Sequence, residues 1–252
     1  MSEKEKLKKI ASYYDDRARN SDAVRAAGQW GSNELVPSII EEICIKINVQ
    51  KDNNVLEIGC GSGILGNAIK NICDLYVGID ISLEMLKKFR NMSEIKLSLF
   101  QCITDVLPFS DNFFDVVIMN SLTMHFNQQN QLLKTLIEIE RVSKKNAIIF
   151  IGDNVVPSGS YWELSWFKNL NSVEQKLIKP YIRIRKWLAQ KNLKLSGKWG
   201  ELHTEVSPNF IKKYFEGRGE VIDSDSAASY IKNKTRNKKS SKRVDFVIKL
   251  KS

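Results

Sequence analysis

The part of this 252-residue chain best suited to chemistry is a short glycine-rich stretch that directly follows an apolar run. Residues 53–66 read NNVLEIGCGSGILG. The glycines of this stretch are Gly59, Gly61, Gly63 and Gly66. A loop with so few side chains lets the backbone approach a nucleotide closely. The GxGxxG spacing from Gly61 onward, with Asp80 placed 19 residues later to hold a ribose hydroxyl, predicts a nucleotide cofactor.

Two further acids favour S-adenosylmethionine (SAM) over a dinucleotide. Glu57 lies two residues before Gly59, where a carboxylate would repel a pyrophosphate and attract the ammonium group of SAM. Asp105 follows a predicted strand and precedes a Leu-Pro turn, where a carboxylate can accept a hydrogen bond from an adenine amino group. An NAD-binding oxidoreductase is the weaker alternative, because the glycines alone satisfy the dinucleotide pattern.

The elements that must position these residues alternate between strand and helix. Apolar runs predict strands at 54–59, 75–82, 95–103, 113–121 and 146–153. Helical periodicity predicts helices at 63–72, 83–92 and 128–143. Repeated βα units of this length imply a parallel sheet with right-handed crossovers.

The end of the chain follows a different pattern. A helix is predicted at 208–219, and two strands at 220–225 and 244–252. No helix-length apolar pattern separates these strands, which favours an antiparallel pair.

Three segments together resemble class I SAM-dependent methyltransferases, and they are similar to the group with ubiquinone- and menaquinone-biosynthesis and small-molecule enzymes. They read VLEIGCGSG, GIDIS and DVLPFSDNFFDVVIMN. The resemblance covers about residues 50–153. It implies an α/β fold, Rossmann-like and doubly wound, with a mostly parallel seven-stranded sheet, an antiparallel last strand and a helical lid insertion.

The expected organisation is a single methyltransferase domain spanning 1–252. Its parts are a helical cap (1–50), a SAM-binding core (51–153), a helical substrate lid (154–206), and a C-terminal helix with antiparallel strands (207–252).

The resemblance also implies roles for individual residues. The loop from Gly59 to Gly63, which includes Cys60, would back the methionine part and the ribose. Asp80 would take the ribose hydroxyls and Ile81 would pack on the adenine. The remaining cofactor contacts implied are Thr104, Asp105 and Val106 around the adenine amino group, Asn120 near the methionyl group and the substrate mouth, and Tyr13, Tyr14 and Trp30 over the cofactor.

Methyl transfer from SAM needs a general base only if the acceptor must lose a proton first. The candidates are His125 after the fourth strand, Asp153 at the end of the fifth, and His203 before the last helix. The fourth strand ends in Asn120 rather than in paired acids, and the four cysteines are scattered. We therefore expect no metal site.

Two acceptor classes remain open. Trp162, Trp166 and Tyr181 in the predicted lid could form an aromatic wall for a small-molecule or peptide acceptor, methylated on O, N or C. The chain has a net charge of +10, concentrated in its second half. This charge makes RNA a second candidate, as for a tRNA wobble-uridine methyltransferase. The charged N-terminus and the scattered cysteines favour a cytoplasmic protein without a membrane anchor.

Overall fold

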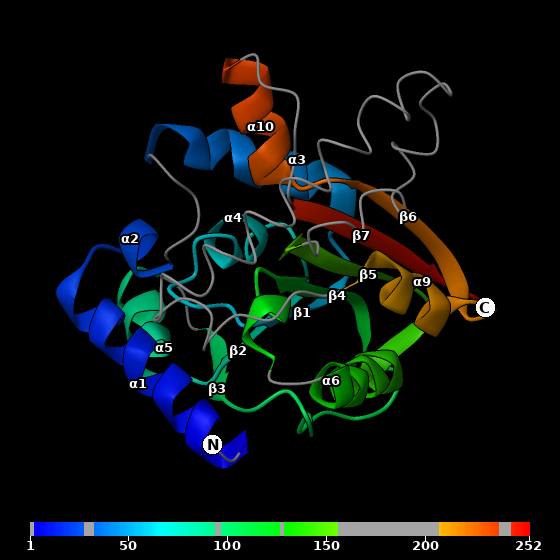
Figure 1. Cartoon of the computed structure of the whole chain (residues 1–252), viewed down its shortest axis with the longest axis horizontal. Helices are drawn as coiled ribbons and strands as arrows, with labels where there is room; N and C mark the ends of the chain where they lie inside the picture. The colour runs from blue at the N-terminus through cyan, green and yellow to red at the C-terminus, as the bar shows by residue number, and fades with distance from the viewer. Residues whose placement is uncertain (1–2, 28–32, 94–96, 127–128, 156–206, 237–242) are drawn as a thin grey trace, which may run out of the picture.

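The computed structural model describes residues 3–27, 33–93, 97–126, 129–155, 207–236 and 243–252 (Figure 1). The N-terminal part contains α1 (Glu3–Asn20), α2 (Ala23–Ala27), the 3-10 turn η1 (Asn33–Leu35) and α3 (Val36–Ile47). The core follows with β1 (Asn54–Ile58), α4 (Gly66–Ile69), β2 (Leu75–Asp80), α5 (Leu83–Asn91), β3 (Ser98–Gln101) and β4 (Phe114–Asn120). Then come η2 (Thr123–His125), α6 (Gln129–Val142) and β5 (Ser143–Val155), and after them α9 (Pro208–Phe215), β6 (Gly219–Asp225), α10 (Ala227–Arg236) and β7 (Arg243–Leu250).

The seven strands form one sheet in the order β3-β2-β1-β4-β5-β7-β6. Strands β1 to β5 pair in parallel, whereas β7 runs antiparallel to both β5 and β6. This arrangement confirms the predicted Rossmann-like α/β sheet with its antiparallel last strand. The chain crosses from β3 back to β4 beside β1, so the carboxyl ends of β1, β2 and β4 meet at the switch point where such sheets bind ligands.

Helices cover both faces of the sheet and bury nearly every residue of its central strands. On one face, Val116 and Ile118 pack with α3, α4, α5 and α10. On the other face, Val117 and Met119 pack with α6 and α9. Figure 1 shows α3 and α10 on one side of the strands and α6 and α9 on the other. The continuous apolar runs in the sequence reflect this burial on two faces.

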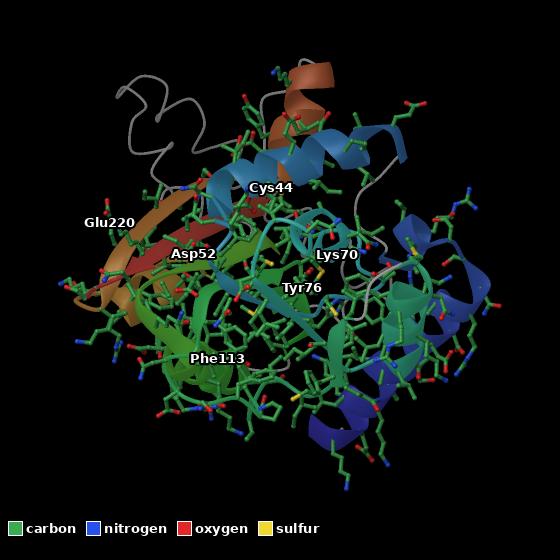
Figure 2. The ribbon with its side chains drawn as sticks, turned by 180° about the vertical axis from the view of Figure 1, so that it is seen from behind. Cys44, Asp52, Lys70, Tyr76, Phe113 and Glu220 are labelled. Carbon is green, nitrogen blue, oxygen red and sulfur yellow. The ribbon has the colours of Figure 1, made fainter. Side chains whose placement is uncertain are left out.

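The N-terminal helices pack on two different parts of the molecule. Helix α3 lies across one face of the sheet and buries Ile39, Ile43 and Ile47 against it. Figure 2 shows the molecule from behind, with Cys44 labelled on this helix. Helices α1 and α2 instead pack on α5 through Ala18, Ala26 and Met85. Helix α2 also reaches the core of the sheet, because Val24 packs against the same cluster as α3.

Two sequence-based expectations about helices were wrong. Helix α4 is four residues long, not the ten predicted at 63–72, because the glycine loop occupies the beginning of that range. Helix α10 lies between β6 and β7, where no helix was predicted. Among the described residues, no helix is both long and apolar enough to cross a membrane.

Candidate cofactor and active site

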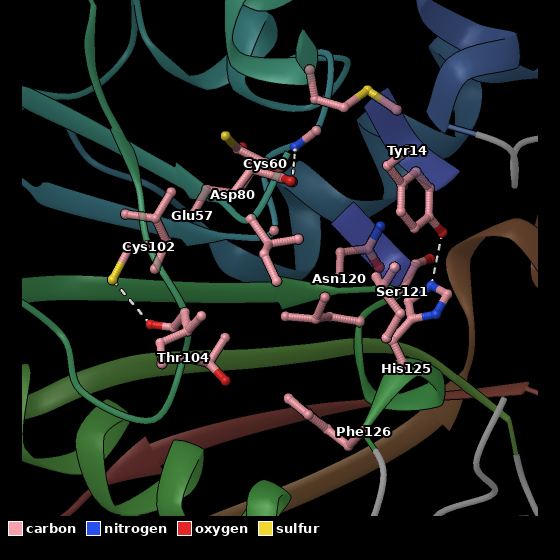
Figure 3. A pocket seen from close by; sticks show the side chains of 18 of the residues that line it. Tyr14, Glu57, Cys60, Asp80, Cys102, Thr104, Asn120, Ser121, His125 and Phe126 are labelled. Atoms are coloured by element: carbon pink, nitrogen blue, oxygen red, sulfur yellow. Dashed lines mark hydrogen bonds between the residues drawn. The ribbon is translucent and has the colours of Figure 1, made fainter. Parts of the chain in front are cut away.

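A cavity of about 1060 Å³, partly open to solvent, lies at the carboxyl ends of β1, β2 and β4 (Figure 3). The sequence-predicted residues that line it are Tyr14, Glu57, Gly59, Cys60, Gly61, Asp80, Ile81, Thr104, Asn120 and His125. Figure 3 shows Tyr14 and His125 at one end and Cys102 and Thr104 at the other, with Glu57, Cys60 and Asp80 between them. The fold thus brings together predicted residues that are up to 111 positions apart, from Tyr14 to His125.

The glycine loop is held to the end of β2 by the acid expected to bind ribose. The backbone N–H of Gly61 donates to Oδ2 of Asp80 over 2.9 Å, and the N–H of Ser82 donates to Oδ1 over 2.8 Å. Burial raises the pKa of Asp80 to about 6, although these backbone donors act in the opposite direction. The backbone of Gly61 is left-handed (φ +52°), and a Cβ there would point into open space.

Gly63 and Gly66 are required by packing against α5 and β2. A Cβ at Gly63 would lie 2.1 Å from the ring of Phe89, and one at Gly66 would lie 2.3 Å from the hydroxyl of Tyr76. Neither of these glycines lines the cavity. The glycines therefore have two roles. Gly61 leaves the loop open, whereas Gly63 and Gly66 allow close packing against α5 and β2.

Glu57 has a partner that the sequence did not indicate. Its side chain is 4% exposed, and the hydroxyl of Tyr76 donates to its Oε2 over 2.5 Å. Burial raises the pKa of Glu57 to about 8, and the charge of Asp80 acts in the same direction. A carboxyl with this pKa is mostly protonated at neutral pH, so the predicted attraction between Glu57 and an ammonium group requires the loss of that proton.

The residues expected around the adenine occupy three different environments. The hydroxyl of Thr104 lines the cavity and lies 2.7 Å from that of Thr135. Asp105 is mostly buried, and its Oδ2 lies 3.6 Å from Nζ of Lys134. Its Oδ1 is buried and has no hydrogen-bond partner among the described residues. Val106 is 70% exposed and does not line the cavity.

The opposite end of the pocket combines the N-terminal helix with the segment after β4. The hydroxyl of Tyr14 lies 2.8 Å from Nε2 of His125, and the two rings meet edge to face. His125 is only 9% exposed and sits in η2, next to Asn120 at the end of β4. Figure 3 shows this hydrogen bond closing that end of the pocket.

Comparisons with known proteins agree with this geometry. Residues 56–151 match the family described as a methyltransferase domain. This matched segment, 96 of the 252 residues, is thus similar to a methyltransferase domain. An uncharacterised protein from Methanocaldococcus jannaschii is 35% identical over 121 residues, which cover 48% of this chain and 49% of that protein. The match therefore spans about half the length of that relative.

Two solved structures share the fold of this chain at low sequence identity. One is a chain from a Haloferax volcanii complex between the Trm112 methyltransferase activator and a methyltransferase. Its TM-score is 0.63 and its sequence identity is 15%, and the match covers 95% of this chain and 98% of that chain. The other is Haemonchus contortus phosphoethanolamine N-methyltransferase 1, solved with phosphoethanolamine and S-adenosylhomocysteine, with a TM-score of 0.71 and 12% identity. That match covers 100% of this chain and 50% of the other.

Several residues proposed from the sequence lie outside this cavity or outside the described residues. Tyr13 is 44% exposed and does not line the cavity, whereas its neighbour Tyr14 does. Asp153 is buried at the carboxyl end of β5, outside the main cavity. The predictions for Trp30, Trp162, Trp166, Tyr181 and His203, and most of the predicted lid at 154–206, lie outside the described residues.

The sequence did not predict part of the cavity wall. Leu7 and Ile10 from α1, Met85 from α5 and Gln131 from α6 all line it. Leu7, Ile10 and Tyr14 recur at a spacing of three and four residues, so the helical periodicity of α1 could have revealed this face. Within the parts of the chain that the structure describes, no group of three or more His, Cys, Asp or Glu side chains is arranged to hold a metal ion.

Proposed function

We propose that this protein transfers a methyl group from SAM to an O, N or C nucleophile of a small-molecule or peptide acceptor by in-line displacement. The observation that carries the proposal is the cavity at the switch point, which has the Gly61–Asp80 pair in its wall and the Tyr14–His125 pair at one end. Pockets at this position of α/β sheets commonly hold cofactors.

The residues present fit SAM. Asp80 would hold the ribose hydroxyls while it fixes the loop at Gly61, and Glu57 would face the ammonium group. Thr104 and Ile81 line the cavity where the adenine would lie, whereas Asp105 does not line it, so a contact between Asp105 and the adenine amino group would need a movement of this loop. When bound, SAM supplies a methyl group on a positively charged sulfur, so the leaving group is already activated.

The chain's own contribution would be orientation, exclusion of water and removal of a proton. Leu7 and Ile10 would shield the pocket from solvent with the apolar face of α1. His125 is the candidate base, because its ring lines the pocket and is fixed by the Tyr14 hydroxyl. Whichever ring tautomer is present, one member of this pair can accept a proton from an acceptor hydroxyl or amine.

A methyl-transfer screen tests the acceptor class. Wild-type protein and Gly61→Val would be incubated with methyl-labelled SAM and, separately, with a metabolite fraction, a peptide fraction and bulk tRNA. We expect label in the metabolite or peptide fraction with the wild type and none with Gly61→Val, whose side chain would occupy the loop's open face.

Label in tRNA alone, with binding that weakens steeply as salt is added, would favour the RNA alternative. Binding of a nicotinamide dinucleotide in place of SAM would favour the weaker oxidoreductase alternative.

A further inference from the structure

The end of the pocket at β3 is where the base of the proposed cofactor would lie. Glu57 at the end of β1 would face the ammonium group and Asp80 at the end of β2 would hold the ribose, so the adenine would extend toward β3, the next strand of the sheet. Cys102 and Thr104, which follow β3, line the cavity there (Figure 3). Because Asp105 does not line it, the hydroxyl of Thr104 is the side-chain oxygen that this loop offers to the base.

The hydrogen of the Thr104 hydroxyl is already used in a bond to α6. Its Oγ1 lies 2.7 Å from Oγ1 of Thr135, and the Thr135 hydroxyl in turn donates to the backbone carbonyl of Gln131 over 3.0 Å. A carbonyl oxygen can only accept, so Thr135 spends its hydrogen there and the hydrogen between the two hydroxyls must come from Thr104. Thr135 is fully buried, so bulk water does not compete for these positions. The Thr104 oxygen can therefore accept a hydrogen bond from a ligand but has no hydrogen left to donate to one.

The rest of the loop after β3 is held by the same helix. The N–H of Leu107 donates to Oε2 of Glu138 over 2.7 Å. The guanidinium of Arg141 donates to the carbonyls of Leu107 (2.9 Å) and Phe109 (2.8 Å) and also pairs with Glu138. These contacts tie the loop to the helix that carries Thr135, which keeps the two hydroxyls together.

We propose that Thr135 is a positioning residue that determines base specificity, because it takes the hydroxyl hydrogen of Thr104 and leaves the Thr104 oxygen as an acceptor for the amino group of adenine. Thr135 itself does not line the cavity. A base with an oxygen in place of that amino group, such as hypoxanthine, would lose the hydrogen bond and bring two acceptor oxygens together. The inference rests on the proposed methyltransferase function and adds to it a means of selecting adenine nucleosides.

Titration with S-adenosylhomocysteine and S-inosylhomocysteine tests this role, because the two compounds differ only in the base, which is adenine in one and hypoxanthine in the other. Both would be titrated calorimetrically into the full-length protein. We expect the wild type to bind S-adenosylhomocysteine about tenfold more tightly.

Thr135→Val keeps the shape of the side chain and removes its hydroxyl, so the Thr104 hydrogen becomes available to the oxygen of hypoxanthine. S-inosylhomocysteine should then gain about fivefold in affinity. The affinity for S-adenosylhomocysteine should change by less than about twofold, because the Thr104 oxygen can still accept. A purely structural role of Thr135 would not raise the affinity for either compound. Thr135→Ser retains the hydroxyl and should keep the wild-type preference.

Two further variants complete the test. Thr104→Val removes the acceptor itself, so it should weaken S-adenosylhomocysteine binding about tenfold and make the two affinities nearly equal. Ser143→Ala is the matched control and should leave both affinities unchanged. The Ser143 hydroxyl is also buried and donates to the carbonyl four residues earlier (Ile139, 2.6 Å), but it lies beyond the other end of α6.

Three results would overturn the inference while leaving the proposed function intact. They are equal affinity of the wild type for the two compounds, a preference that survives Thr135→Val unchanged, and a preference that Ser143→Ala weakens just as much. Binding of neither compound to the wild type would contradict the proposed function as well.

Discussion

Glu57 lies where the proposed cofactor needs an acid, but its carboxyl group differs in protonation state from the carboxylate expected from the sequence. The sequence identified an acid in the right place, but the carboxyl is buried against Tyr76 and binds a proton at neutral pH while the pocket is empty. A neutral carboxyl is less costly to bury than a charged one. An arriving ammonium group would favour the charged form, so we infer that cofactor binding is accompanied by proton release at this residue.

The raised pKa of Glu57 has a consequence for stability. The native carboxyl titrates at about 8 and the unfolded one near 4.5, so the native state binds more protons between these values. The contribution of Glu57 to stability is therefore complete below pH 4.5 and is lost as the pH rises through 8. Between pH 6.5 and 9, we expect the free energy of unfolding of the cofactor-free protein to fall by about 2 kcal/mol.

Denaturant unfolding at several pH values measures this slope. Glu57→Gln, which resembles the protonated carboxyl, should have a clearly flatter profile over the same range. Identical slopes for the wild type and the variant would mean that Glu57 does not carry a raised pKa.

At the scale of elements, α1 is attached to the parts of the chain that form the cofactor site. Tyr14 contacts His125 after β4, and Asp15 accepts hydrogen bonds from the hydroxyl of Ser82 and the N–H of Glu84 at the start of α5. The next helix is fixed in a similar way, because the hydroxyl of Ser62 in the glycine loop donates to the carbonyl of Ala23. These contacts make the N-terminal segment a wall of the pocket.

A double-mutant cycle measures the coupling between α1 and η2. Tyr14→Phe and His125→Phe keep the aromatic rings and remove the hydrogen bond, so each should lower the free energy of unfolding by about 1 kcal/mol. The double variant should lose little more than either single one, because both remove the same interaction. Tyr13→Phe, at an exposed position, should change stability by less than about 0.5 kcal/mol. Strictly additive losses would show that the pair is not coupled.

The sequence predicted the strands well, because β1, β2 and β4 are short apolar runs that must be buried on both faces. It did not predict α10, whose segment AASYIKNKTR has few apolar residues. Tertiary contacts fix the start of this helix, where the N–H of Ala227 donates to Asp245 and the N–H of Ser229 donates to the hydroxyl of Ser226. A local pattern cannot reveal a partner that comes from another strand.

The same limit applies to the candidate site. The positions of the glycine loop and Asp80 could be predicted, because they follow consecutive strands whose carboxyl ends meet at one edge. The pairing of Tyr14 with His125 joins residues 111 positions apart, and that of Glu57 with Tyr76 depends on the register of β1 and β2. Contacts of these kinds exist only once the sheet has formed.

At the scale of the whole molecule, the sheet places the cofactor cavity and a second, smaller cavity at the carboxyl ends of its central strands, on either side of the end of β4. The first cavity has the features expected for SAM, and the second has room for about one water molecule, which would satisfy the buried Oδ1 of Asp153. The antiparallel β7 brings Asp245 and Arg243 to the second cavity and the parallel strands build the first. The mixed sheet thus places the Gly61–Asp80 loop and the buried carboxylates of Asp153 and Asp245 at the same edge.

Calorimetric titration of the purified protein with S-adenosylhomocysteine and, in parallel, with NADH tests the central claim most directly. We predict saturable, micromolar-range binding of S-adenosylhomocysteine and no binding of NADH. Gly61→Val should lose this affinity, whereas Gly66→Ala should mainly lose stability because its Cβ would meet Tyr76 and Phe89. Binding of NADH, or unchanged S-adenosylhomocysteine affinity in Gly61→Val, would contradict the account.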